Sequence, residues 1–135
     1  MALINWNDNL SVKVTEFDEQ HKKLIGMVND LHSAMGAGKS REIMDSVLTG
    51  LVDYTVNHFA AEEKLMQKHG YPSFAKHKAE HDALTKQVGD IMVKFKEGKT
   101  VVTIDLMNFL KDWLTKHIQG TDKQYGPFLN SKNVQ

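Results

Sequence analysis

Two pairs of side chains in this sequence have the spacing that allows one metal ion to be bound from one face of a helix. His58 and Glu62 are four residues apart, and so are His77 and His81. Residues at this spacing are neighbours on a helix surface, with Cβ atoms about 5 to 6 Å apart. Imidazole and carboxylate groups are strong metal ligands. Each pair therefore predicts part of a metal site, provided that a helix forms there.

Two further histidines occur in rows of apolar residues. His21 begins a row that continues with Val28, and His117 ends a row that includes Trp113. Helical recurrence of apolar residues predicts that each row faces a core, so five histidines are directed inward. A single inward histidine is more often structural than a ligand. Burying five without a shared partner would cost about 1 to 3 kcal/mol for each unpaired group, which favours a common metal.

Asp122 is a candidate ligand whose position requires a local distortion. It lies five residues after His117, and on a regular helix this spacing rotates a side chain by roughly 140° out of line. A π-bulge or local unwinding near Gly120 would return Asp122 to the inner face, and such bulges are frequent at functional sites. We therefore predict a helix irregularity at this point.

The composition limits what the metal can be. The 135 residues include seven histidines and no cysteine, which excludes thiolate sites, iron–sulfur clusters and disulfides. Five imidazoles and two carboxylates exceed the needs of one ion and indicate two ions bridged by the carboxylates. With one bridging oxide or hydroxide, all but one of their octahedral positions are filled. Nitrogen and oxygen ligation favours iron, and the single vacancy suits a diatomic ligand.

Long amphipathic helices are expected to position these side chains. Turn residues gather in three clusters, and between them apolar residues recur at helical spacing. We expect four helices, at about 18–36, 41–68, 74–97, and 103–119 or beyond. The expected N-cap residues are Asp18 or Thr15, Ser40, Ser73 and Thr103.

The short connections between these helices make neighbours antiparallel. The predicted fold is all-α: an up-down-up-down four-helix bundle that forms a single domain over residues 1–135. An irregular arm of about residues 1–17 precedes the bundle, and we expect Trp6 in this arm to pack across it.

Charge and hydropathy exclude several classes of function. Lysine and arginine number 17, and so do aspartate and glutamate, so the chain lacks the basic surface that nucleic acid binding requires. No window approaches the roughly 20 apolar residues of a membrane span. The first residues do not resemble a signal peptide, so we expect a cytoplasmic protein. Mixed charges such as Glu63-Lys64 are interpreted as solvated faces, His69 as structural, and His32 as either a buried hydrogen-bonded histidine or a surface one.

The ordered set of motifs resembles the hemerythrin family, and more closely its bacterial single-domain members, over nearly the whole chain. The segments that carry the resemblance are Trp6 and Ser11-Val12 in the arm, Asp18-Glu-Gln-His21, His58-x-x-x-Glu62, His77-x-x-x-His81, and Trp113-Leu-x-x-His117-x-x-x-x-Asp122. Each segment is weak evidence by itself, whereas the ordered set is specific.

The resemblance implies how the ligands are divided between two iron ions, Fe2+ or Fe3+, with a bridging oxide or hydroxide. One iron would be bound by His77, His81 and His117, the other by His21 and His58, and both would be bridged by Glu62 and Asp122. O2 would bind at the vacancy on the two-histidine iron. The residues expected to seal the ligand pocket are Phe59, Trp113, Leu114 and Ile118.

The function implied by the resemblance is reversible O2 binding for storage or delivery inside the cell, with an O2-consuming oxidase as a possible recipient. It assigns no enzymatic activity and no catalytic residue. The alternatives are an oxygen or redox sensor, a peroxide-handling di-iron protein, and a structural zinc site. Seven ligands are too many for one tetrahedral zinc ion.

Overall fold

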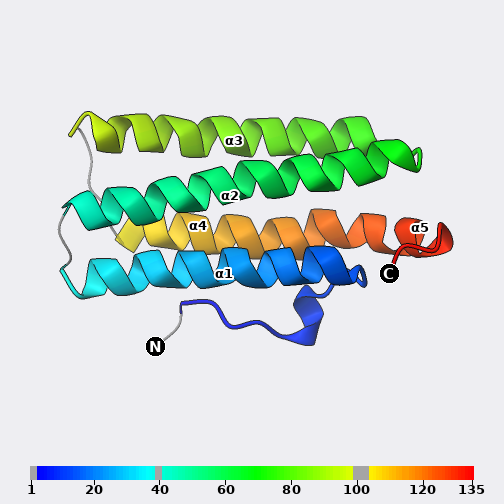
Figure 1. Cartoon of the computed structure of the whole chain (residues 1–135), viewed down its shortest axis with the longest axis horizontal. Helices are drawn as coiled ribbons and strands as arrows, with labels where there is room; N and C mark the ends of the chain where they lie inside the picture. The colour runs from blue at the N-terminus through cyan, green and yellow to red at the C-terminus, as the bar shows by residue number, and fades with distance from the viewer. Residues whose placement is uncertain (1–2, 39–40, 99–103) are drawn as a thin grey trace.

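The chain forms four long helices that run in alternating directions (Figure 1). The structure is a computed structural model that describes residues 3–38, 41–98 and 104–135. α1 packs against α2 and α4, and α2 packs against α3. The helices are α1 (Thr15–Gly36), α2 (Arg41–Lys68), α3 (Phe74–Lys96) and α4 (Ile104–Lys116), preceded by a 3-10 turn, η1 (Asp8–Leu10). The predicted four-helix bundle is confirmed, and the described residues contain no strand.

The chain continues beyond α4 through a distorted segment. A π-helix, η2 (His117–Thr121), is followed by a 3-10 turn, η3 (Asp122–Gln124), and a short helix, α5 (Tyr125–Ser131). In the π-helix the backbone N–H of Asp122 donates to the carbonyl of His117, five residues earlier. The irregularity predicted near Gly120 is therefore confirmed, and it takes the π form.

The start of α1 differs from the prediction. The helix begins at Thr15, with Val14 as an N-cap residue that makes no side-chain capping bond. The carboxylate of Asp18 instead accepts hydrogen bonds from the backbone N–H of Val12, at 2.8 Å, and from Oγ of Ser11, at 2.6 Å. The predicted capping role of Asp18 or Thr15 is wrong, because Asp18 fastens the arm to the helix.

The other helix ends lie close to the predicted positions. Ser73 takes the N-cap position of α3, although its side chain makes no capping hydrogen bond. α3 ends at Lys96, one residue before the predicted end. The predicted caps Ser40 and Thr103 lie outside the described residues.

The N-terminal arm lies along α1 (Figure 1). The backbone N–H of Ile4 donates to Oδ1 of Asn29 at 2.9 Å, and Nδ2 of Asn29 donates to the carbonyl of Ile4 at 2.8 Å. Val12 is part of the buried core. The half-buried Trp6 packs against this core. Nζ of Lys22 lies 5.1 Å from the centre of the Trp6 ring. The arm therefore covers the helix as predicted.

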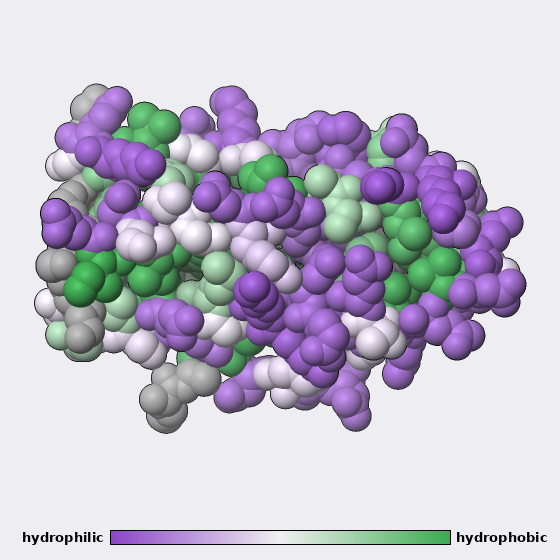
Figure 2. Space-filling model, in the orientation of Figure 1, coloured by the Kyte–Doolittle hydropathy of each residue, from purple (hydrophilic) through white to green (hydrophobic). Residues whose placement is uncertain are grey.

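One outer face of the bundle is mostly polar. Hydrophilic residues cover most of the face shown in Figure 2, with smaller apolar areas toward its two ends. Within the described part of the chain, no helix is both long and apolar enough to cross a bilayer.

The arm approaches α5 so closely that only glycine fits at Gly126. A Cβ atom at this position would overlap the carbonyl oxygen of Val12. We expect Gly126→Ala to lower the free energy of unfolding by about 1 to 3 kcal/mol, because backbone rather than a flexible side chain must shift. Urea unfolding of the two proteins measures this difference.

Gly89 provides the matched control for this substitution. It lies within α3, and nothing lies within 4 Å of the Cβ that an alanine would add. Gly89→Ala should leave stability unchanged or raise it by about 0.5 to 1 kcal/mol. Equal effects of the two substitutions would contradict the close approach of the arm.

Candidate metal centre

The seven side chains predicted to bind metal lie together in the core of the bundle. They come from α1, α2, α3, η2 and η3, and each is at most 4% exposed. They form two overlapping groups of possible ligand atoms, the first with five residues and the second with four. The seven side chains are His21, His58, Glu62, His77, His81, His117 and Asp122.

The first group surrounds the Nε2 atoms of three histidines. Nε2 of His81 lies 3.1 Å from Nε2 of His77 and from Nε2 of His117. Oδ1 of Asp122 lies 3.0 Å from Nε2 of both His77 and His117. Oε1 of Glu62 lies 3.3 Å from Nε2 of His81. Neighbouring ligand atoms of an octahedral ion with bonds of 2.0 to 2.1 Å are about 3 Å apart, which these distances match.

The second group contains two histidines and the same two carboxylates. Nε2 of His21 lies 3.1 Å from Oδ2 of Asp122 and 3.4 Å from Oε2 of Glu62. Nε2 of His58 lies 3.3 Å from Oε1 of Glu62. The two oxygens of Asp122 thus face different groups, as a bridging carboxylate requires. Oε1 of Glu62 lies between His58 and His81, so this carboxylate also contacts both groups.

Several of these atoms are buried without a hydrogen-bond partner. They are both ring nitrogens of His21, Nε2 of His58, Oε1 of Glu62, and both carboxylate oxygens of Asp122. Each such group costs about 1 to 3 kcal/mol when it is left unsatisfied. Metal ions at these positions would satisfy all of them except the outer nitrogen of His21, so the residues fit a two-metal site.

The carboxylates dominate the electrostatics of the centre. Burial lowers the pKa of His21, but the Asp122 and Glu62 carboxylates 3.1 and 3.4 Å from its Nε2 outweigh burial and raise this pKa to about 10. The pKa of His117 is raised against burial to about 9, mainly by Asp122. Burial and Glu62 raise the pKa of Asp122, but the histidines hold it well below its usual range. The centre therefore keeps anionic oxygens that attract cations.

Two glutamates that the sequence did not identify as part of the site support histidines of the first group. Nδ1 of His81 donates to Oε2 of Glu63 at 2.9 Å. Nδ1 of His117 donates to Oε1 of Glu80 at 2.8 Å, and the hydroxyl of Thr121 donates to the same oxygen at 2.8 Å. The interpretation of Glu63 as part of a solvated face is wrong, because its side chain turns toward α3. Such partners orient ligating imidazoles.

Gln20 performs the corresponding role in the second group. Its Oε1 accepts a hydrogen bond from Nδ1 of His58 at 2.5 Å. Gln20, Glu63 and Glu80 each directly precede or follow a predicted ligand in the sequence, and each contacts a histidine on the next helix. Adjacency to a ligand is therefore the sequence signal that could have identified them.

Tyr125 is a further residue that the sequence did not identify. It is fully buried, and its hydroxyl donates to Oε2 of Glu62. Its ring stacks near that of His77, with centroids 5.6 Å apart. Burial and the two carboxylates raise the pKa of Tyr125 well above its usual value, so the phenol keeps its proton.

The four residues predicted to line a ligand pocket are all buried in the core. Phe59 stacks on His81, with ring centroids 3.8 Å apart and planes 6° from parallel. The Trp113 ring packs edge to face against the Phe59 ring, with ring centroids 6.2 Å apart. Leu114 and Ile118 are 2% and 0% exposed. Phe59 thus places an aromatic ring directly against the first group, and Trp113 packs behind it.

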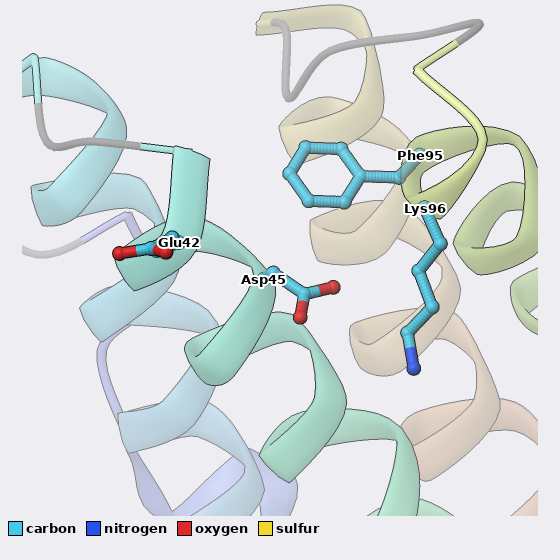
Figure 3. A pocket seen from close by; sticks show the side chains of 4 residues that line it. All are labelled: Glu42, Asp45, Phe95 and Lys96. Atoms are coloured by element: carbon cyan, nitrogen blue, oxygen red, sulfur yellow. The ribbon is translucent and has the colours of Figure 1, made fainter.

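A small polar cavity reaches the centre from outside. Its volume is about 110 Å³, and it is lined by Tyr71, Ser73, Lys76, His77, Glu80, Thr121 and Gln124. A larger cavity of about 240 Å³ lies between α2 and α3, and its described lining consists of Glu42, Asp45, Phe95 and Lys96 (Figure 3). This larger cavity shares no described residue with the metal centre. Neither His32 nor His69 belongs to the metal-binding groups found among the described residues.

Comparison with known proteins gives consistent similarities over most of the chain. Residues 12–129 match the family model of the hemerythrin HHE cation binding domain. The chain is 44% identical to the bacteriohemerythrin of Methylococcus capsulatus, over 97% of this chain and 100% of that protein. It is 38% identical to the bacteriohemerythrin of Stenotrophomonas maltophilia, over 93% and 80%. A crystal structure of wild-type hemerythrin superposes with a TM-score of 0.90 at 43% identity, covering 93% of this chain and 97% of that one.

The shared position of Asp122 leads to a test of the centre. Asp122→Ala removes the carboxylate that faces both groups, so we expect the iron content to fall from about two ions per chain to below one. Iron analysis of the purified proteins measures this, and circular dichroism checks that the variant stays helical. His32→Ala, which alters a histidine outside both groups, should retain the full iron content. Unchanged iron in Asp122→Ala would contradict the shared position.

Proposed function

This chain belongs to the hemerythrin family, whose members bind a di-iron centre, and we propose that it binds O2 reversibly for storage or delivery inside the cell. The observation that carries the proposal is the convergence of five buried histidines and two buried carboxylates, with ligand atoms spaced as for octahedral ions. An O2-consuming oxidase is the kind of recipient that a delivery role requires.

The proposed ligand division follows the two groups. His77, His81 and His117 bind one iron, and His21 and His58 bind the other. Glu62 and Asp122 bridge the two ions. The distances between Asp122 and the histidines of both groups support this division. The group with two histidines supplies one ligand fewer, so the open coordination position is assigned to its iron.

When bound, a ferrous pair supplies electrons and an open coordination position for O2. The protein residues hold this pair among side chains that are each at most 4% exposed. Phe59 covers one face of His81, and we propose that the buried Leu114 and Ile118 extend this contact into an apolar wall beside the histidines. These side chains exclude the water and anions that would displace a weakly held diatomic ligand.

The hydrogen bond between Tyr125 and Glu62 holds a proton that stays on the phenol. The Tyr125 hydroxyl donates to Oε2 of Glu62 and retains its proton because its pKa is raised. This hydrogen bond holds Glu62 in place without supplying an acid of suitable pKa for turnover. We therefore propose that the protein carries O2 and does not catalyse a reaction. Sensing and peroxide handling are the alternatives that the oxygenation experiment below distinguishes.

Repeated oxygenation of the iron-loaded protein tests this function. After anaerobic reduction, we expect addition of O2 to produce a visible charge-transfer band that disappears when O2 is removed. The band should return over several cycles with little loss. Rapid consumption of added peroxide, or irreversible oxidation in the first cycle, would contradict reversible carriage.

Leu114 provides a test of the apolar wall. Leu114→Ala opens space beside the histidines, so water and anions should reach the centre and speed oxidation to the inactive diferric form. The decay of the oxygenated absorption band under air measures this rate. Leu48→Ala removes the same atoms from another buried leucine, 14 residues or about 21 Å before Glu62 along α2. Equal oxidation rates in Leu114→Ala and Leu48→Ala would show that the faster oxidation results from lost stability and not from an opened apolar wall.

A further inference from the structure

The outer nitrogens of the ligating histidines have different partners in the two groups. In the three-histidine group, His81 donates to Glu63 at 2.9 Å and His117 donates to Glu80 at 2.8 Å. Both acceptors are carboxylates. The third histidine, His77, lines the polar cavity of about 110 Å³. Two negative charges are therefore bonded to the outer edge of this group.

The two-histidine group has no such charge. The outer nitrogen of His58 bonds to the neutral amide oxygen of Gln20 at 2.5 Å. The outer nitrogen of His21 is buried, and no described residue forms a hydrogen bond with it. The bridging carboxylates are common to both groups, so they do not create the difference. The asymmetry arises from Glu63 and Glu80.

Charge at the outer nitrogen changes what the imidazole offers to a metal. A carboxylate that accepts the Nδ1–H bond draws the proton toward itself and makes the inner nitrogen a stronger donor. A stronger donor stabilises the more positive ion, Fe3+, relative to Fe2+. An amide oxygen orients the ring without adding negative charge.

From this asymmetry we propose that Glu63 and Glu80 are positioning residues that make the iron of the three-histidine group the more easily oxidised of the two. The inference rests on the ligand division proposed above. An external one-electron oxidant such as ferricyanide then removes its electron from that ferrous ion and is itself reduced to ferrocyanide. The iron of the two-histidine group, to which O2 binding is assigned, stays ferrous.

The surroundings of the two glutamates fix them in place. Oε1 of Glu80 accepts hydrogen bonds from the hydroxyl of Thr121 and from Nδ1 of His117, both at 2.8 Å, so two donors hold this carboxylate in position. Nζ of Lys78 lies 3.6 Å from Oε1 of Glu63, so the positive charge of Lys78 offsets part of the effect of the Glu63 carboxylate on His81. Side-chain exposure is 20% for Glu63 and 38% for Glu80, so solvent screens both charges in part. We expect the larger effect from Glu80, which has no lysine or arginine at ion-pair distance among the described residues.

The test compares three nearly isosteric variants of the iron-loaded protein. Glu63→Gln and Glu80→Gln keep an acceptor oxygen but remove the charge, and Gln20→Glu adds a charge to the other group. Anaerobic titration with ferricyanide, followed by electron paramagnetic resonance, measures the two potentials and the largest half-oxidised fraction. Both glutamine variants should raise the first potential, and Gln20→Glu should lower the second. All three should reduce the half-oxidised fraction.

Glu42→Gln is the matched control, because Glu42 is exposed and lies 20 residues, or about 30 Å, before Glu62 along α2. It removes the same charge and should change neither potential. Unchanged potentials in Glu80→Gln with iron fully bound, or equal directions in Glu80→Gln and Gln20→Glu, would overturn the inference. Failure of the unaltered protein to bind about two irons would instead overturn the ligand division itself, so the two failures are distinguishable.

Discussion

The structure depends on a set of buried ligand atoms that the protein itself does not satisfy. Asp122 places two such atoms in the core, and His21, His58 and Glu62 each place one. A bundle of this size has only a small margin of net stability, so uncompensated polar groups are a large burden. Metal ions that coordinate these atoms would remove the cost of burying them unpaired. The folding of the core and the loading of the centre are therefore parts of one equilibrium.

The π-helix shows how a departure from regular geometry completes the set. A regular helix after His117 would have directed Asp122 away from the centre. The wider turn of η2 brings both side chains into the same group of possible ligand atoms, since Oδ1 of Asp122 lies 3.0 Å from Nε2 of His117. The same turn places Thr121 against Glu80 and leads into α5, which carries Tyr125. One local irregularity thus positions a bridge, an outer contact and a buried phenol.

Most of the fold and all seven candidate ligands could be predicted from the sequence, because apolar periodicity and i,i+4 spacing are local properties of a helix. The contacts between helices could not. Whether Glu63 faces solvent or His81 depends on the rotation of α2 relative to α3, which no single segment encodes. Asp18 looked like a helix cap but binds the arm, since its carboxylate had a tertiary donor within reach. Tyr125 lay beyond the expected end of the last helix.

The outer contacts of the centre follow the order of the helices. A residue beside a ligand on α1 supports a histidine on α2, one on α2 supports α3, and one on α3 supports the segment after α4. Each of these hydrogen bonds requires a particular rotation of one helical segment relative to the next. The series does not return to α1, because the outer nitrogen of His21 has no hydrogen-bond partner among the described residues. α1 therefore enters the series only through Gln20, and the arm that bonds to Asn29 adds a contact along the same helix.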